Sequence, residues 1–169
     1  MKTIYYCSFK SKVGTIHIAS TDKGVFRIDL PTHTKTEFLA SLKKESNGAK
    51  IVESAAKHKR IAEELKRYFD GKLERFRSKL DPRGTEFQLQ VWNELRKIPY
   101  GTVISYKQLA LRVGKPDGSR AVGHANGTNP LPIVVPCHRV LGSGNNLVGY
   151  GGGIKMKEYL LRLEGALML

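Results

Sequence analysis

Cysteine is scarce in this sequence, which contains only Cys7 and Cys137 among its 169 residues. Two cysteines cannot form a disulfide framework or a thiolate-rich zinc site. The five histidines show no HxxxH pair or other local spacing of metal ligands. We therefore expect no bound metal and no other cofactor. The plain interpretation of each cysteine is a small buried hydrophobic residue.

Long apolar runs are also missing, since no segment approaches the roughly 18 apolar residues of a membrane span. The N-terminal stretch MKTIYYCSFKSKVG has too short an apolar segment for a signal peptide, and it lacks a small-residue cleavage site. We expect no membrane association and a cytoplasmic, or else nuclear, location. A hydrophobic content of 40% and a charged content of 26% are typical of a soluble globular protein.

Acidic side chains are few, with 15 Asp and Glu against 29 Lys and Arg, so the net charge is +14. The excess is spread along the chain: residues 1–85 carry 19 basic and 10 acidic side chains, and residues 86–169 carry 10 and 5. Such a charge favours polyanionic partners, above all nucleic acid. A lysine-rich solubilising surface is the alternative, and charge alone does not decide between the two.

The first half of the chain predicts an antiparallel meander followed by two helices. Alternating apolar residues indicate three strands, TIYYCSF (3–9), VGTIHIAS (13–20) and VFRIDL (25–30). The first helix is expected to start near Thr34 or Thr36. The second is expected from about Ser54 to Phe69, with Gly71 ending it. The basic segment KLERFRSKLDPRG (72–84) is interpreted as a connector.

The second half predicts several helices. Thr85 with Gln88, and Ser105 with Gln108, form capping boxes that open two of them. The second of these helices covers about 106–113, and after the turn KPDG another covers about 119–126. Two short helices joined by such a turn have the outline of a helix-turn-helix. The last of these helices carries one long basic residue, Arg120, among small ones, which allow close approach to another surface: Ala121, Gly123, Ala125 and Gly127.

The segment VVPCHRVLG (134–142) places a cysteine and a histidine at the end of an apolar run. A thiol becomes a nucleophile when a neighbouring base favours the thiolate. Neighbours on an extended chain point to opposite sides, so we expect a water molecule to link Cys137 to His138. A carboxylate behind the histidine would fix its tautomer, and the helix expected at about 155–163 offers Glu158 and Glu164.

Several segments together resemble the O6-alkylguanine-DNA alkyltransferases, the suicide DNA-repair methyltransferases. They are NPLPIVVPCHRV (129–140), GYGGG (149–153), KEYLLRLEG (157–165), GTVISYKQLA (101–110) and SRAVGHA (119–125). The match is nearly continuous from Phe87 to Gly165. The resemblance implies a ribonuclease-H-like α/β domain with an antiparallel sheet at 1–80. It also implies a helical, winged-helix-like domain at 81–169, which binds DNA and carries the alkyl acceptor.

The resemblance assigns five residues to catalysis. Cys137 would accept the alkyl group, His138 would activate it through water, and Glu164 would orient His138. Tyr106 would donate a proton toward N3 of the departing guanine. Asn129 would brace the turn between the helix-turn-helix and the active site.

The remaining assignments concern the guanine and the DNA. Arg120 would fill the gap left in the base stack when the damaged nucleotide is extruded. The backbone carbonyls of Cys137 and Val140 would accept the exocyclic amine of guanine, while Tyr150 and the amide of Gly151 would close over the base and meet its O6. The DNA-contacting positions of the recognition helix, which would lie in the minor groove, are Ser119, Arg120, Ala121 and Gly123.

The implied partner is double-stranded DNA that contains O6-alkylguanine, bound by a monomer. The sequence departs from part of the family at Gly151, where some relatives have serine, and in lacking cysteines for the structural zinc that others carry. Relatives that bind lesions without repairing them lack the acceptor cysteine, and Cys137 argues against that class. Two rival hypotheses remain: a non-catalytic DNA-binding regulator, which leaves PCHRV unexplained, and a cysteine hydrolase, for which no oxyanion hole is evident.

Overall fold

The computed structural model describes residues 2–167 and divides into two compact units, Met1–Pro82 and Arg83–Leu169. Within the described part of the chain, none of the helices has the length and apolar character that crossing a membrane would require.

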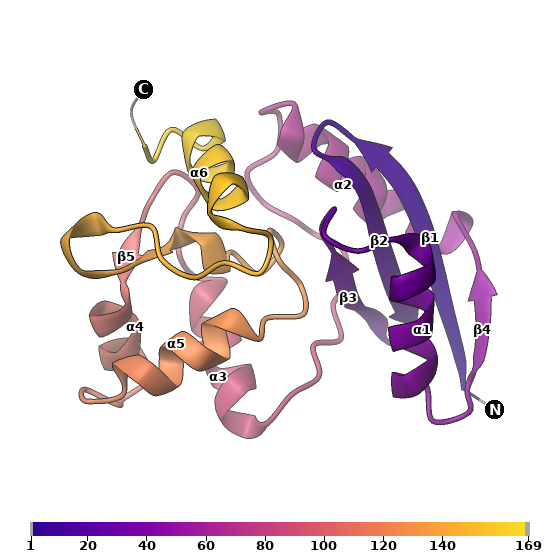
Figure 1. Ribbon diagram of the computed structural model, residues 1–169, viewed down its shortest axis with the longest axis horizontal. Coiled ribbons are helices and arrows are strands. Elements are labelled where there is room, and N and C mark those ends of the chain that lie inside the picture. The colour runs from indigo at the N-terminus through magenta and orange to yellow at the C-terminus, as the bar shows by residue number, and fades with distance from the viewer. Residues whose placement is uncertain (1, 168–169) are drawn as a thin grey trace. The chain divides into compact units, whose positions relative to one another are not determined.

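A four-stranded sheet forms the centre of the first unit (Figure 1), with strand order β3-β2-β1-β4. The strands β1, β2 and β3 pair in antiparallel fashion and confirm the meander. The fourth strand, β4, was not predicted, and it lies parallel to β1. The strand bounds are Thr3–Ser11 (β1), Gly14–Thr21 (β2), Gly24–Asp29 (β3) and Lys50–Glu53 (β4).

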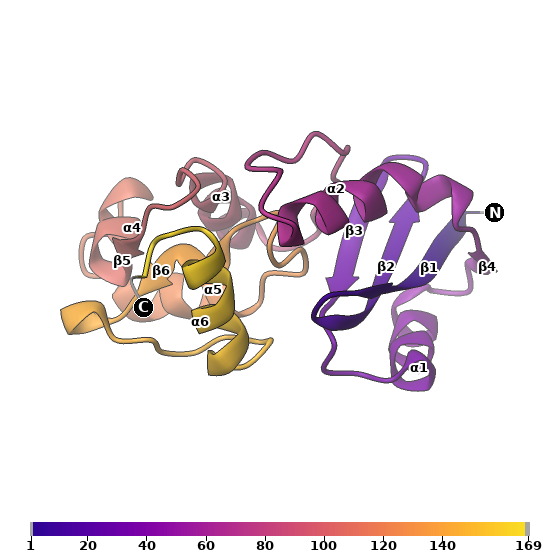
Figure 2. The same cartoon turned by 90° about the horizontal axis from the view of Figure 1, so that it is seen from above.

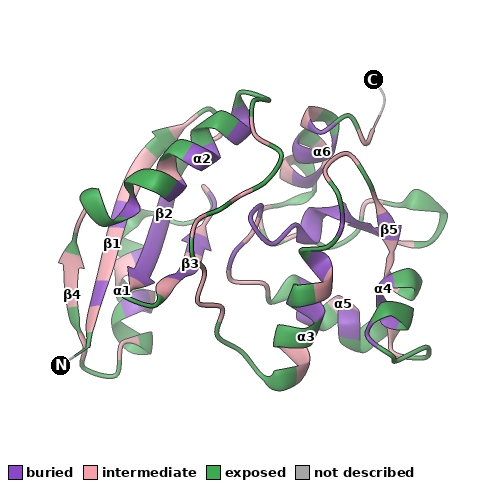
Figure 3. Ribbon diagram, turned by 180° about the vertical axis from the view of Figure 1, so that it is seen from behind, coloured by how far each residue is buried: buried purple, intermediate pink, exposed green. Residues whose placement is uncertain are grey.

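Two helices, α1 (Lys35–Glu45) and α2 (Lys59–Phe69), cover opposite faces of this sheet. Figure 1 shows α1 in front of the strands, and the reverse view in Figure 3 shows α2 in front of them. Alternation along β1 explains this: Ile4 packs with Phe38 of α1 in a buried cluster, whereas the ring of Tyr5 meets Lys57 just before α2. Both faces of the sheet are thus buried.

The first helix begins where the sequence indicated, because Thr34 and Glu37 form a capping box. The expected start of the second helix at Ser54 is wrong. The backbone NH of Ser54 donates to the carbonyl of Tyr6 and so extends the sheet. A single 3-10 turn, η1 (Ala56–His58), comes before the α-helical residues.

The second unit is helical and contains one short parallel pair of strands (Figure 2). Strand β5 precedes α4, and its Ile104 pairs with Val140 of β6. The elements are α3 (Glu86–Leu95), β5 (Ile104–Ser105), α4 (Tyr106–Arg112), α5 (Ser119–Gly127), η2 (Cys137–Arg139), β6 (Val140–Leu141), η3 (Ser143–Asn145) and α6 (Ile154–Leu163).

The pair α4 and α5 forms the expected helix-turn-helix, and the two helices lie side by side in Figures 1 and 2. Both capping boxes are present, at Thr85 and at Ser105. Gly114 has φ of +71°, a left-handed conformation that ends α4 without strain. Helix α3 supports α5 from below, since the indole NH of Trp92 donates to the carbonyl of Ala125 at 2.8 Å.

Candidate active site

The segment around Cys137 is buried and tightly turned. Residues 133–141 are all buried, and Cys137 is only 5% exposed. The expectation of an extended chain at Cys137 and His138 is wrong, because the two residues lie in the single 3-10 turn η2. Ile133, at φ +72°, is a β-branched residue in the left-handed region, so the backbone leading to the cysteine is strained.

Asn129 holds this segment in place. Its side-chain Nδ2 donates to the carbonyl of Val135 at 2.7 Å, and its Oδ1 accepts from the backbone NH of Leu131 at 2.9 Å. Together these two bonds fix the chain on both sides of the strained Ile133. Burial raises the pKa of the Cys137 thiol to about 11, although hydrogen bonding by Asn129 and the charge of Lys157 oppose that rise. The thiol at rest is therefore protonated, and its activation requires a base.

His138 supplies a base of fixed tautomer. Its side chain is fully buried, and its Nε2 lies 2.8 Å from Oε1 of Glu164. Because a carboxylate only accepts hydrogen bonds, Nε2 carries the hydrogen and Nδ1 is left as an acceptor. Nδ1 is buried and has no hydrogen-bond partner in the described chain. Burial lowers the pKa of His138 although Glu164 opposes it, so the imidazole is neutral.

Arg139 also belongs to this network, and the sequence analysis missed it. Its Nε and Nη2 donate to the two oxygens of Glu164 at 2.9 and 2.8 Å, and its Nη1 donates to the carbonyl of Ile98 at 2.6 Å. Burial alone would raise the pKa of Glu164, but the hydrogen bonds from His138 and Arg139 lower it to about 2. The carboxylate therefore remains charged at neutral pH.

Lys157 is a second residue that the sequence analysis missed. Its side chain is fully buried, and its Nζ donates to the carbonyls of Val140 at 2.6 Å and Val148 at 2.9 Å. Burial lowers the pKa of Lys157 to about 8, opposed by the charge of Cys137. The ammonium thus connects α6 to the strand that follows the cysteine and to the glycine-rich loop at 142–153.

One sequence pattern could have revealed these buried charges. The buried face of α6 repeats at helical spacing through Lys157, Leu160 and Leu161, and Glu164 continues it just beyond the last turn. Charged residues on an apolar helix face must find partners inside the protein. Arg139 follows the same logic, because it stands within the uninterrupted buried run 133–141.

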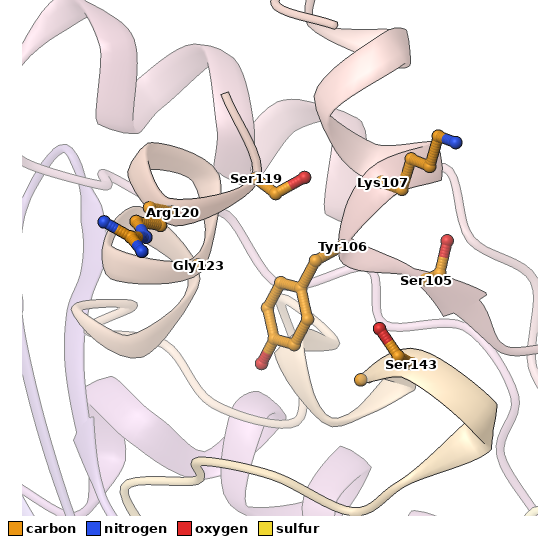
Figure 4. Close-up of a pocket in the computed structure, with 8 residues that line it drawn as sticks. Ser105, Tyr106, Lys107, Ser119, Arg120, Gly123 and Ser143 are labelled. Carbon is orange, nitrogen blue, oxygen red and sulfur yellow. The ribbon is translucent and has the colours of Figure 1, made fainter. Parts of the chain in front are cut away.

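A pocket of about 590 Å³ opens between the first turns of α4 and α5 and the loop after β6 (Figure 4). In Figure 4 the Tyr106 ring reaches from α4 into the space beside α5. Arg120 and Ala121 are exposed on α5, while Cys137 does not line this pocket. The lining residues are Ser105, Tyr106, Lys107, Ser119, Arg120, Gly123, Gly142 and Ser143.

Tyr106 connects the pocket with the buried cysteine. Burial raises the pKa of its phenol, and the charge that Cys137 carries as a thiolate would raise it further. The ring of Tyr150 meets the imidazole of His138 edge-on at 6.5 Å between centroids. The Tyr150 hydroxyl is buried with no hydrogen-bond partner in the described chain, and Gly151 beside it is exposed.

The expected site residues thus fall into two groups. Cys137, His138, Glu164 and Asn129 lie around the buried turn, whereas Ser119, Arg120 and Ala121 lie at the surface of the helix-turn-helix. Among residues 2–167, no group of three or more His, Cys, Asp or Glu side chains is arranged to hold a metal ion.

Known proteins resemble this chain along nearly its whole length. Residues 86–166 match the domain described as 6-O-methylguanine DNA methyltransferase, DNA binding domain, and residues 4–82 match the ribonuclease-like domain of the same description. A methylated-DNA–protein-cysteine methyltransferase of Methanosarcina barkeri is 43% identical, over 95% of this chain and 97% of the relative. The inducible protein of the same description from Bacillus subtilis is 41% identical, over 96% and 90%.

Solved structures agree with these matches. A crystal structure of Mycobacterium tuberculosis OGT in complex with DNA has a TM-score of 0.81 and 36% identity, and the alignment covers 96% of this chain and 93% of that one. A structure of the Mycobacterium tuberculosis O6-methylguanine methyltransferase has a TM-score of 0.83 and 35% identity over the same shares. The fold class expected from the sequence, a ribonuclease-like α/β domain followed by a helical DNA-binding domain, is confirmed.

Proposed function

Because this chain belongs to the 6-O-methylguanine DNA methyltransferase family, we propose that it repairs DNA by moving an alkyl group from O6 of guanine to Cys137. The reaction is that of a methylated-DNA–protein-cysteine methyltransferase, in which the protein is consumed as the alkyl acceptor. The observation that carries the assignment to Cys137 is the buried thiol next to a histidine whose Nε2 is hydrogen-bonded to a charged carboxylate.

The transfer is a single displacement at the alkyl carbon. The Cys137 sulfur attacks that carbon, the S–C bond forms, and the C–O6 bond breaks with its electron pair remaining on O6. The thiol proton passes toward Nδ1 of His138, which is the free acceptor, through a bridging water. The guanine regains one proton as it leaves, and Tyr106 is placed to deliver it at N3. A thioether does not revert to a thiol, so each molecule acts once.

The residues around Cys137 have supporting roles. Glu164 keeps the hydrogen of His138 on Nε2, and Asn129 keeps the strained segment in its turn. The carbonyls of Cys137 and Val140 accept the exocyclic amine of the guanine. The carbonyl of Val140 keeps a second lone pair for this while Lys157 occupies the first. Tyr150 and the amide of Gly151 close over the base at O6.

Helix α5 is the element that docks on DNA. Its exposed surface carries Arg120 among small residues, so the helix can lie close to the floor of the minor groove. The reacting carbon is inaccessible in a stacked duplex, and the nucleotide must therefore be extruded from the stack to reach Cys137. Arg120 then occupies the vacated space in the base stack, while Ser119, Ala121 and Gly123 contact the DNA backbone. The unit at 81–169 thus performs both binding and chemistry, as a monomer. A cytoplasmic location suits a thiol that must stay reduced.

The test is the mass of the intact protein after mixing with duplex DNA that contains O6-methylguanine. We expect the mass to rise by one methyl group, and peptide mapping to find that group on Cys137. The Cys137→Ala variant should gain no methyl group yet bind the DNA about as tightly, because the phosphate contacts come from dispersed Lys and Arg.

The Cys7→Ala variant is the matched control. Cys7 is a second buried cysteine, with a pKa that burial raises to about 11, so this variant should react like the wild type. A methyl group on Cys7 would contradict the assignment. If the mass of the wild-type protein does not change, the hypothesis of a non-catalytic DNA-binding regulator is supported. Repeated catalytic turnover would support the hypothesis of a cysteine hydrolase.

A further inference from the structure

Asn126 is a buried polar residue of the recognition helix that the roles above leave unexplained. Its side chain is only 2% exposed, and its Nδ2 donates to the carbonyl of Cys137 at 3.3 Å. Its Oδ1 is buried and accepts no hydrogen bond in the described chain. A buried amide with one unsatisfied atom destabilises a fold, and an apolar side chain of the same shape would avoid that penalty. The presence of an amide here therefore points to a role in the reaction.

The face of α5 that carries Asn126 lies against Tyr106, the first residue of α4. The Tyr106 ring lies against α5 at Gly123, where a Cβ atom would come within 3.7 Å of two ring carbons. Gly123 and Asn126 are three residues apart and so lie on one face of the helix. Figure 4 shows the ring extending from α4 along this side of α5, with its hydroxyl at the far end. Burial raises the pKa of Tyr106, and the amide of Asn126 opposes that rise.

The two hydrogens of the Asn126 amide can serve two acceptors at once. The Cys137 carbonyl accepts one of them, and the second is the hydrogen that we assign to the phenolic oxygen of Tyr106. A donor at that oxygen stabilises the negative charge that develops when the phenol releases its proton. The same amide therefore sets the spacing between the proton donor for N3 of the guanine and the carbonyl that accepts the guanine's exocyclic amine.

We propose that Asn126 is a positioning residue that acts through Tyr106, holding the phenol and the Cys137 carbonyl in register with the edge of the extruded guanine. This inference rests on the proposed function. It assigns to α5 a part in proton delivery as well as in DNA docking.

A double-mutant cycle tests this proposal. Asn126→Leu keeps the branched shape and removes the amide, with its hydrogen bond to the Cys137 carbonyl, and Tyr106→Phe removes the hydroxyl. Single-turnover rate constants are measured at saturating O6-methylguanine duplex, through the mass of the Cys137 adduct. We expect Tyr106→Phe to slow transfer by ~10²-fold or more, Asn126→Leu to slow it by about tenfold, and the double variant to be no slower than Tyr106→Phe alone. The Kd for DNA should change little in all three variants.

Val122→Ala is the matched control, since Val122 is buried in the same helix and carries no polar group. Its effect on the rate should multiply with that of Tyr106→Phe. If the effect of Asn126→Leu on the rate constant also multiplies with that of Tyr106→Phe, the two residues act independently and the proposal is wrong. Asn126→Ala repeats the cycle if the leucine variant does not fold. If neither Asn126→Leu nor Asn126→Ala folds, Asn126 is a requirement of the fold, and this result would equally overturn the proposal. A wild-type chain that forms no Cys137 adduct would instead contradict the proposed function.

Discussion

At the scale of single residues, the charge on Glu164 is shared between two different tasks. One oxygen accepts from both His138 and Arg139, and the other accepts from Arg139. The guanidinium keeps the carboxylate ionised, and the ionised carboxylate keeps the imidazole hydrogen on Nε2. Removing either Arg139 or Glu164 would leave the charge of the other buried and uncompensated, which is strongly destabilising. The catalytic tautomer of the histidine and the stability of this unit therefore depend on the same carboxylate.

This sharing predicts a loss of stability in acid. The pKa of Glu164 is about 2 in the fold and 4.5 in its ordinary state, so the unfolded chain binds a proton more readily. The stabilisation by Glu164 is complete above about pH 4.5 and disappears as the pH falls toward about 2. We expect wild-type protein to lose more free energy of unfolding than Glu164→Gln between about pH 5 and about pH 3, as measured by urea denaturation.

Glu158→Gln is the matched control for that measurement. Glu158 lies on the same helix and pairs with Arg162 at the surface. Its replacement should leave the acid sensitivity of the wild type unchanged, because exposed ion pairs contribute little. His138 takes up a proton on unfolding in all of these proteins, since burial lowers its pKa in the fold. Equal acid sensitivity in wild type and Glu164→Gln would contradict the buried network.

At the scale of elements, helix α5 has two faces with separate functions. Val122, Ala125 and Asn126 are buried against the rest of the unit, and Ala125 is held by Trp92 of α3. Arg120 and Ala121 face outward. Because α5 is fixed by its contact with α3, it can insert a side chain into DNA without a shift of its own backbone.

Arg120→Ala should therefore separate extrusion from chemistry. If the guanidinium fills the gap left by the extruded guanine, it offsets an unstacking cost of a few kcal/mol. We expect the variant to repair duplex DNA roughly tenfold to a thousandfold more slowly, since about 1.4 kcal/mol corresponds to a factor of ten. The reaction of Cys137 with free O6-benzylguanine needs no extrusion and should be much less affected. The measurement is the ratio of variant to wild-type rate constants on the two substrates.

Arg112→Ala provides the comparison for charge alone. Arg112 ends α4, is exposed and does not line the pocket. Its removal should weaken DNA binding modestly and leave the rate at saturation unchanged. Equal losses on both substrates for Arg120→Ala would mean that this residue supports the pocket or the fold, and its role in the base stack would have to be abandoned.

Local signals explain which elements could be predicted from the sequence. The boxes at Thr85 and Ser105 are formed by residues three apart, so they depend on no distant contact. Strand β4 was missed because four residues give too little alternation, and it exists by pairing with β1. The start of α2 was misplaced because a distant contact determines it: the backbone NH of Ser54 donates to the carbonyl of Tyr6, which keeps Ser54 in the sheet.

The candidate site divides along the same line. The motif around Cys137 consists of consecutive residues and can therefore be recognised in the sequence. Glu164 could be associated with His138 through the resemblance to the alkyltransferase family. The partners of Arg139 and Lys157 could not be assigned, because they include backbone carbonyls that the fold brings from a distance, besides the Glu164 carboxylate that binds Arg139. Ile98 is 41 positions from Arg139, and Val140 is 17 positions from Lys157. No local pattern specifies such contacts.

At the scale of the whole molecule, the charge of +14 sets how the protein meets DNA. Binding releases counterions, so affinity should fall steeply as salt rises. A chain that neutralises six or more phosphates would lose roughly 10³-fold in affinity between about 50 and 200 mM salt. We expect this slope for Cys137→Ala on undamaged and on O6-methylguanine duplex alike, by fluorescence anisotropy. An affinity independent of salt would contradict the electrostatic role of the charge.

The burial of Cys137 has a consequence for the time before any lesion is met. A protein used once must keep its sulfur intact from synthesis until that encounter. Oxidants such as peroxide attack the exposed thiolate, whereas this thiol is 5% exposed and its pKa is raised to about 11. The burial that raises the pKa of this thiol also protects its sulfur from oxidation before the protein is used. The resistance of this thiol to oxidation and its need for a base in order to react both follow from its burial.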